Sequence, residues 1–279
     1  MKLSGAMFAK FEKWEGLGND FIIAEVREGH GFGPFGPAEA RALCDRRRGI
    51  GADGVLLVER LAGQAPRMIV WNADGSRPEM CGNGLRCLAA HIAEESREPV
   101  RELVVETDAG PRTCLVERVS PGIYEVTVGM GTARSTGELA VSVGGREHRF
   151  QKVDVGNPHA ISFEPFEDAD LDRVGPVAAT AVPGGTNVEL CRVREVAAGE
   201  APLIEVIVWE RGVGRTLACG TGACAALAAA CDAGLAPFGT PVRLALPGGE
   251  LLVTVGAERR DITMKGPARK VFAGEVVSA

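Results

Sequence analysis

The same four-residue pattern occurs twice in this sequence, and the repeat restricts the folds open to the chain. Cys81-Gly82-Asn83-Gly84 and Cys219-Gly220-Thr221-Gly222 each precede an apolar segment, and they lie 138 positions apart in a chain of 279 residues. Two further pairs share this offset: Trp71 with Trp209, and Asn19 with Asn157. Three pairs at one spacing indicate an internal duplication, so we predict two similar halves that present the same loops to a shared interface.

Each motif is expected to begin a helix. The segment after Cys81 places Leu85, Leu88 and Ile92 on one face, which is the spacing of an amphipathic helix. The segment after Cys219 carries alanine on every face, which is typical of a helix that is buried on all sides. Two other helices are predicted, over 37–47 and 168–179.

Alternating or β-branched segments predict strands around these helices. In the first half they cover 7–13, 20–26, 55–60, 67–72, 102–107, 112–119 and 123–128; in the second half they cover 138–143, 147–155, 160–164, 188–194, 203–210, 241–246, 250–256 and 270–277. We therefore predict an α+β fold of two pseudo-symmetric domains, each a mostly antiparallel sheet or barrel wrapped around a central helix.

The length also predicts two domains, because one domain per roughly 150 residues is typical. We place the N-terminal domain at 1–131 and the C-terminal domain at 132–267. The segment 129–137 is the expected crossover. The C-terminal strand, within 268–279, is expected to return to the first domain.

Charge and hydropathy exclude several classes of function. The net charge is −6, which is unfavourable for binding nucleic acid or an anionic membrane surface. The least polar run, residues 216–231, is shorter than the roughly 20 residues of a membrane span. Lys10, Glu12 and Lys13 interrupt any apolar core of a signal peptide, so we predict a cytoplasmic protein with reduced thiols.

The cysteines show no metal-binding spacing. There is no Cys-x-x-Cys among the eight cysteines, and the four histidines, at 30, 91, 148 and 159, are scattered. We predict no metal and no disulfide framework. The cysteines outside the two motifs are predicted to be small buried apolar residues: Cys44, Cys87, Cys114, Cys191, Cys224 and Cys231.

The two remaining thiols, Cys81 and Cys219, lie where a helix start would activate them. Backbone N–H groups and the helix dipole stabilise a thiolate there, so we predict that the pKa of both thiols is lowered. The same N–H groups can bind a carboxylate. Two such helix starts facing each other would hold a substrate carboxylate between two thiols, one of which removes the α-proton while the other delivers a proton to the opposite face. This inverts a stereocentre without a cofactor.

The chain resembles the diaminopimelate epimerase family at these motifs and at others in the family's order. They are Gly16-Leu17-Gly18-Asn19-Asp20-Phe21, Gly49-Ile50-Gly51-Ala52-Asp53-Gly54, Asn72-Ala73-Asp74-Gly75-Ser76, the segment 81–87, Gly156-Asn157-Pro158-His159, Thr186-Asn187, the segment 210–214 and Cys219-Gly220-Thr221-Gly222-Ala223. The resemblance implies a cofactor-independent enzyme that interconverts LL- and meso-diaminopimelate in lysine and peptidoglycan-precursor biosynthesis. It also implies a homodimer.

The resemblance assigns roles by position. Cys81 and Cys219 would be the acid/base pair, and His159 and Glu210 would modulate the pKa values of the thiols. The main-chain donors to the carboxylate would be Gly82, Asn83, Gly220 and Thr221. The rest of the substrate would contact Asn19, Asn72, Asn157, Asn187, Glu210 and Arg211. Some members carry a substrate-contacting Gln where this chain has Gly54, so that contact is expected to differ here.

Two alternatives stay open at this stage. Proline racemase and hydroxyproline epimerase share the two-thiol pattern, but they typically carry His where this chain has Asn83. A different class is a redox switch, in which Cys81 and Cys219 form a disulfide. The turn residues Asp53 and Asp74 are predicted to have a structural role only.

Overall fold

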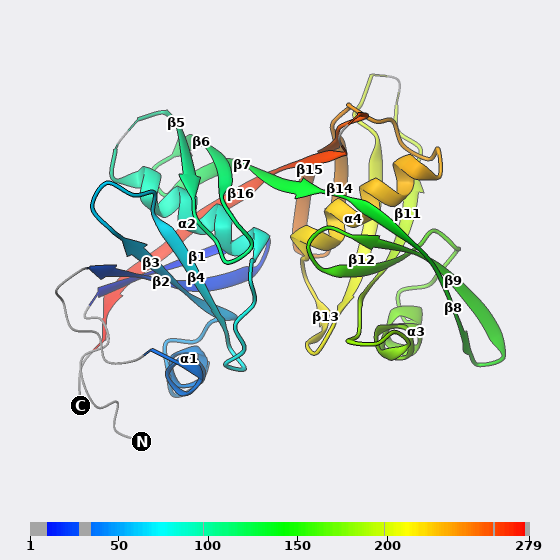
Figure 1. The fold of residues 1–279 in the computed structure, drawn as a ribbon, viewed down its shortest axis with the longest axis horizontal. Coiled ribbons are helices and arrows are strands. Elements are labelled where there is room, and N and C mark those ends of the chain that lie inside the picture. The colour runs from blue at the N-terminus through cyan, green and yellow to red at the C-terminus, as the bar shows by residue number, and fades with distance from the viewer. Residues whose placement is uncertain (1–9, 28–34, 97, 198, 259, 277–279) are drawn as a thin grey trace. The chain divides into compact units, whose positions relative to one another are not determined.

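The computed structural model describes residues 10–27, 35–96, 98–197, 199–258 and 260–276 (Figure 1). It divides into two compact units, Met1–Val128 with Gly266–Ala279, and Gly129–Lys265. Strands predominate and helices are fewer, so the predicted α+β class is confirmed. His30 lies outside the described residues, as do the first residues of the predicted strand 7–13.

Unit 1 is a curved sheet around one helix. Its elements are β1 (Lys10–Gly16), β2 (Asn19–Arg27), α1 (Pro37–Cys44), β3 (Gly54–Arg60), β4 (Arg67–Asn72), α2 (Gly82–Glu94), β5 (Val100–Val105), β6 (Arg112–Ser120), the first part of β7 (Ile123–Thr132) and the last part of β16 (Asp261–Glu275). The sheet runs β4-β3-β2-β1-β16, and β7 joins β16 to β6 and β5. Helix α2 contacts all of β1 to β6, which makes it the central helix of the unit.

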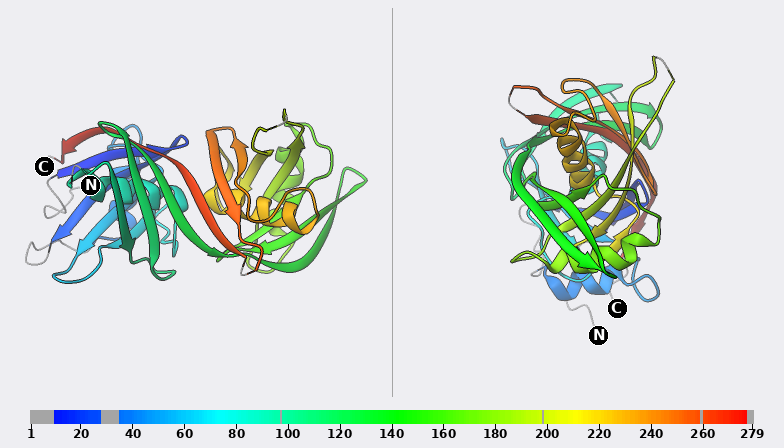
Figure 2. Two further views of the ribbon diagram at one scale, coloured as in Figure 1. Left: turned by 90° about the horizontal axis from the view of Figure 1, so that it is seen from above. Right: turned by 90° about the vertical axis from the view of Figure 1, so that its right-hand side faces the viewer.

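Unit 2 repeats this plan around α4. Its elements are β8 (Arg134–Val143), β9 (Arg146–Asp154), β10 (Pro158–Ser162), α3 (Asp170–Thr180), β11 (Asn187–Arg194), β12 (Leu203–Glu210), β13 (Gly214–Thr216), α4 (Gly220–Asp232), β14 (Val242–Leu246) and β15 (Gly249–Val255). The order is β16-β15-β14-β12-β11-β10-β9-β8. Strands of this unit enclose α4 (Figure 2). The alanines of the helix are fully buried.

The duplication is visible inside each unit. Helices α2 and α4 both have 13 residues and begin directly after the motif cysteine. The units share a parallel pair in a mostly antiparallel sheet: β2 with β3, where Phe21 lies opposite Gly54, and β10 with β11, where His159 lies opposite Asn187. Unit 2 has a further parallel pair, β12 with β14. By this pairing β2 corresponds to β10 and β3 corresponds to β11.

Several element boundaries differ from the sequence prediction. The predicted crossover at 129–137 is mostly strand, because β7 continues to Thr132 and β8 begins at Arg134. Helix α1 ends at Cys44 instead of 47, since the Asp45 carboxylate accepts the N–H groups of Arg47 and Arg48 and closes a turn. The last strand begins at 261 rather than 270, and the three-residue β13 is too short to leave a periodic signal.

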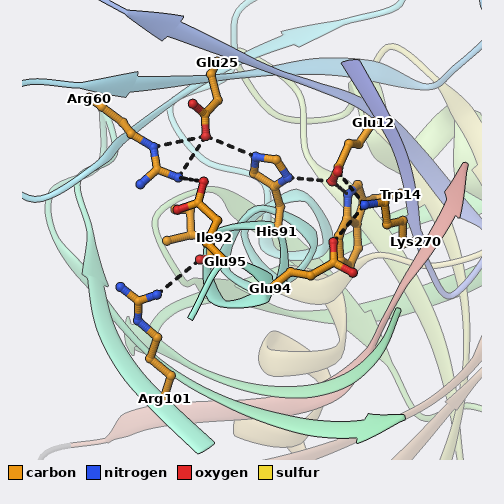
Figure 3. Close-up of polar contacts among 10 residues, drawn as sticks. All are labelled: Glu12, Trp14, Glu25, Arg60, His91, Ile92, Glu94, Glu95, Arg101 and Lys270. Carbon is orange, nitrogen blue, oxygen red and sulfur yellow. Dashed lines mark hydrogen bonds and ion pairs between the residues drawn. The ribbon is translucent and has the colours of Figure 1, made fainter. Parts of the chain in front are cut away.

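Half-buried charges hold the last turn of α2 in place (Figure 3). His91 Nδ1 lies 2.7 Å from Glu12 Oε2, and its Nε2 lies 3.6 Å from Glu25 Oε1, an ion pair beyond hydrogen-bond distance. Lys270 and Arg60 complete the pairing of these two carboxylates. Burial alone would lower the pKa of His91, but the two carboxylates raise it to about 9. This network ties α2 to β1, β2, β3 and β16.

None of the helices in the described part of the chain is long and apolar enough to span a membrane.

Candidate active site

Each motif cysteine caps its central helix. Cys81 has an extended backbone, and its Sγ accepts the N–H of Gly84 at 3.4 Å. Cys219 has almost the same backbone angles, and its Sγ accepts the N–H of Gly222 at 3.3 Å. Both thiols thus lie at the positive end of a helix, as the sequence predicts. They differ in exposure, because Cys219 is buried and Cys81 is half-buried.

In unit 1 a chain of amides leads to the start of α2. The buried Asn83 donates from Nδ2 to Asn19 Oδ1 at 3.2 Å, and Asn19 Nδ2 donates to Asp53 Oδ2 at 2.8 Å. Arg86 donates to Asn83 Oδ1 at 3.1 Å. These bonds fix the orientation of each amide group, because they determine which position holds its oxygen and which its nitrogen. Asp53 therefore does more than form a turn: it orients Asn19, a role that the sequence prediction missed.

The same link recurs in unit 2 at the same chain separation. Asn157 Nδ2 donates to Thr221 Oγ1 at 3.4 Å, and Thr221 Oγ1 lies 3.5 Å from Cys219 Sγ. Asn157 and Thr221 are offset by 138 positions from Asn19 and Asn83. In both units, an asparagine at or directly before the start of the first strand of the parallel pair, β2 or β10, reaches the first turn of the central helix.

Unit 2 contains a buried pair of a histidine and a carboxylate. His159 Nδ1 lies 2.7 Å from Glu189 Oε1, and both side chains are fully buried. His159 Nε2 lies 3.1 Å from Asn157 Oδ1. The sequence singled out His159 but not Glu189. The available signal was a carboxylate inside the apolar run of β11, since Glu is almost never fully buried unless it is paired.

The other predicted substrate-binding residues lie at strand ends of their own units. Asn187 begins β11, and its Oδ1 accepts the N–H of Arg211 at 2.9 Å. Glu210 ends β12 and accepts from Thr216 Oγ1 at 2.6 Å. Arg211 donates to the Gly184 carbonyl at 2.7 Å. Asn72, at the end of β4, donates to Ser76 Oγ at 2.9 Å. Each of these side chains is oriented by a hydrogen-bond partner from its own unit.

Gly54 lies where the resemblance implies a Gln in some relatives. A Cβ at this position would meet the Trp71 carbonyl at 2.8 Å, closer than real Cβ contacts allow. The position begins β3, as Asn187 begins β11 in unit 2. The backbone here therefore does not admit the longer side chain without a shift of β4.

The pKa of Cys219 corrects one prediction. Burial raises the pKa of this thiol well above the ordinary value, and the carboxylates of Glu210 and Glu189 raise it further. Hydrogen bonds from Thr221 and Gly222 lower it by less. The predicted lowering is therefore wrong for Cys219, because loss of solvation outweighs the donors of the helix start. For Cys81 the lowering stays a prediction.

The remaining cysteines pack in the cores. All eight cysteines are free, and the six outside the motifs are buried. Burial raises the pKa of Cys44 and Cys231 to about 11 and that of Cys114 to about 12. Among the residues that the structure describes, no group of three or more His, Cys, Asp or Glu side chains could hold a metal ion.

Comparisons with known proteins identify relatives over the whole chain. The family model of diaminopimelate epimerase matches residues 11–136 and 152–271. The chain is 38% identical to the diaminopimelate epimerase of Desulfitobacterium hafniense, over 94% of this chain and 96% of that protein. It is 40% identical to that of Sphingopyxis alaskensis, over 96% of this chain and 97% of that protein.

Solved structures share the fold at low sequence identity. A hydroxyproline epimerase from Agrobacterium vitis, with bound trans-4-OH-L-proline, matches with a TM-score of 0.70 at 16% identity, over 100% of this chain and 95% of that one. A phenazine biosynthesis protein from Bacillus anthracis matches with a TM-score of 0.70 at 14% identity, over 96% of this chain and 99% of that one. At such identities these neighbours support the fold alone.

Proposed function

The chain belongs to the diaminopimelate epimerase family, a family of isomerases, and on this premise we propose that it interconverts LL- and meso-diaminopimelate through Cys81 and Cys219 without a cofactor. We place this reaction in lysine and peptidoglycan-precursor biosynthesis in the cytoplasm. The observation that carries the proposal is the duplicated helix start. In each unit a cysteine caps the central helix through an N–H···Sγ bond, and an asparagine reaches the residue two positions later.

The proton transfers follow from the two thiols. A thiolate removes the α-proton, and the electrons of the C–H bond spread into the substrate carboxylate. The other thiol donates its proton to the opposite face, which inverts the centre and exchanges the states of the two cysteines. Because the pKa of Cys219 is raised, Cys219 holds its proton in the free enzyme and serves as the acid when Cys81 is the base. The reverse reaction exchanges these roles.

The carboxylate at the reacting centre needs hydrogen-bond donors. We assign the main-chain N–H groups of Gly82, Asn83, Gly220 and Thr221, which open the two helices. Such donors favour the transition state, where negative charge on the carboxylate grows. For the rest of the substrate we assign Arg211 to the distal carboxylate and Glu210 to an ammonium group, with amide contacts from Asn19, Asn72, Asn157 and Asn187.

An epimerase assay tests the proposal. LL-Diaminopimelate is supplied with a reductant and no cofactor, and the appearance of the meso isomer is followed. We expect Cys81→Ala and Cys219→Ala each to lower kcat by at least about 10²-fold, within the contribution of general acid–base catalysis. Cys44→Ala, at a buried cysteine outside the motifs, is the matched control. Solvent deuterium should enter the product at the α-carbon. Full activity of either motif variant, or product without deuterium, contradicts the mechanism.

Two alternative functions can be tested on the same purified protein. Turnover of proline above that of diaminopimelate would favour a proline racemase-like activity, which the shared fold permits. Air oxidation followed by peptide mapping tests whether the two motif thiols can meet. We expect a disulfide that joins Cys81 to Cys219 and abolishes activity. A binding activity found only in the oxidised form would favour a redox switch.

We also propose a homodimer. Exposed large apolar side chains lie on β5, β6, β7 and β16, and they include Val100, Val119 and Phe272. Light scattering on the purified chain decides between one copy and two, and a Val119→Glu variant that stays dimeric would exclude this face as the interface.

A further inference from the structure

The environment of the second thiol differs from that of the first at two matched positions. In the parallel pair β10–β11, His159 lies opposite Asn187, and Glu189 lies two positions further along. In the matching pair β2–β3, the corresponding positions are occupied by Phe21 and Leu56. The duplication therefore carries a His–Glu pair in unit 2 where unit 1 carries two apolar side chains.

Glu189 lies directly against the turn that carries Cys219. A Cβ on Gly222 would be 2.5 Å from Glu189 Oε1 and 3.2 Å from Cys219 Sγ. The carboxylate oxygen and the sulfur thus border the same small space above the first turn of α4. At the matching Gly84, a Cβ would instead meet Leu56 Cδ2 at 3.1 Å. Because Gly222 has no side chain, unit 2 has room for the Glu189 carboxylate at this point, where unit 1 has the Leu56 side chain.

A packing role does not explain this carboxylate. Glu189 is fully buried, and among the described residues its Oε2 has no hydrogen-bond partner. A half-satisfied buried carboxylate costs free energy relative to an apolar side chain, which the matched position in unit 1 shows to be compatible with the fold. Its one strong contact is the 2.7 Å bond to His159 Nδ1.

We infer that Glu189 is a positioning residue, which accepts the hydrogen bond of the His159 Nδ1–H and thereby holds Nε2–H against Asn157 Oδ1, at the start of a hydrogen-bonded series that continues through Thr221 to Cys219. Both ring nitrogens face oxygens that accept, Glu189 Oε1 and Asn157 Oδ1, so both act as donors, and the carboxylate holds the ring in one orientation. The inference rests on the proposed function, since it assigns Glu189 to the proton-transfer machinery of that site. It adds a difference in hydrogen-bonded surroundings to the difference in exposure between the two thiols.

Kinetics of Glu189→Gln test the role in catalysis. Gln keeps the volume and an acceptor oxygen but removes the charge that orients the ring. We expect kcat to fall about 10- to 100-fold with KM within about threefold, because a residue that acts on proton transfer changes the transition state more than binding. The matched control is Glu164→Gln, which alters a carboxylate that also faces a histidine, His148, at 3.8 Å and is more exposed. It should retain wild-type kinetics.

NMR of the imidazole nitrogens gives a readout that needs no substrate. The signal of His159 is assigned by its loss in His159→Gln. In the wild type we expect a protonated Nδ1 with a proton at low field, as a short bond to a carboxylate produces. Glu189→Leu, which copies Leu56 of unit 1, should lose that proton signal while unfolding at a temperature close to that of the wild type.

The outcomes separate the two proposals. An unprotonated Nδ1 in the wild type overturns the inference even if no variant folds. Wild-type kcat in a folded Glu189→Gln also overturns it, whatever the spectrum shows. Failure of the wild type to epimerise diaminopimelate contradicts the proposed function instead. The spectrum of His159 still reports whether its Nδ1–H donates to Glu189.

Discussion

His91 should make the stability of unit 1 depend on pH in a window where few side chains titrate. Its side chain is 12% exposed and lies between Glu12 and Glu25 (Figure 3). Its pKa is raised from 6.5 to about 9. Below the unfolded value the imidazolium is present in both states and its stabilisation is complete. As pH rises toward the folded value, the folded state retains a proton that the unfolded state has lost, so the free energy of unfolding falls.

The size of this effect follows from the pKa difference. Each pKa unit corresponds to about 1.4 kcal/mol, so a rise from 6.5 to about 9 corresponds to about 3 kcal/mol. The stability of wild type relative to His91→Gln should therefore decline by about 3 kcal/mol from about pH 6 to about pH 10. Glu12, whose pKa is lowered to about 2, stays ionised throughout this range and does not contribute to the decline.

Urea unfolding followed by fluorine NMR of fluorotryptophan-labelled protein measures the effect in the correct unit. Trp14 lies 6.3 Å from His91 between ring centroids, and Trp71 is in the same unit, whereas Trp209 reports unit 2. The control is His148→Gln, in unit 2, which should leave the decline at Trp14 unchanged. A difference between wild type and His91→Gln that does not vary with pH at Trp14 refutes the reasoning.

Three further predictions concern the site. Gly222→Ala should lower kcat as Glu189→Gln does and destabilise the fold by about 1–3 kcal/mol, since its Cβ would lie 2.5 Å from the carboxylate; unchanged kinetics and denaturation would contradict this. Asp53→Ala should lower kcat/KM about 10-fold by releasing Asn19, whereas Asp74→Ala, whose carboxylate caps Ser76, should not; equal effects in steady-state kinetics would exclude the assigned role. Mass-spectrometric mapping of iodoacetamide labelling should find Cys81 modified first, and prior labelling of any core cysteine would show that its burial does not protect it.

Local sequence pattern was sufficient for the elements that a periodic or capped segment defines. The helices after Cys81 and Cys219 begin directly after the cysteine, as predicted, because its sulfur can accept an N–H of the first turn. The apolar pattern indicates whether one face of the helix or all of its faces are buried. The α+β class followed from strand periodicity around those helices. Boundaries failed where a side chain decided them, as at Asp45, or where a strand continued through glycines, as in β7.

The duplication, the two helix-capping thiols and the family could therefore be derived from the sequence alone, because each depends on residues close together in the chain or on a constant offset. The partner of His159 could not, since Glu189 is 30 positions away and reaches it only through the parallel pairing of β10 and β11. The raised pKa of Cys219 could not be predicted from the sequence either, because burial depends on the fold of the whole unit. The strands that enclose α4 exclude water from the sulfur, and the local motif does not indicate this burial.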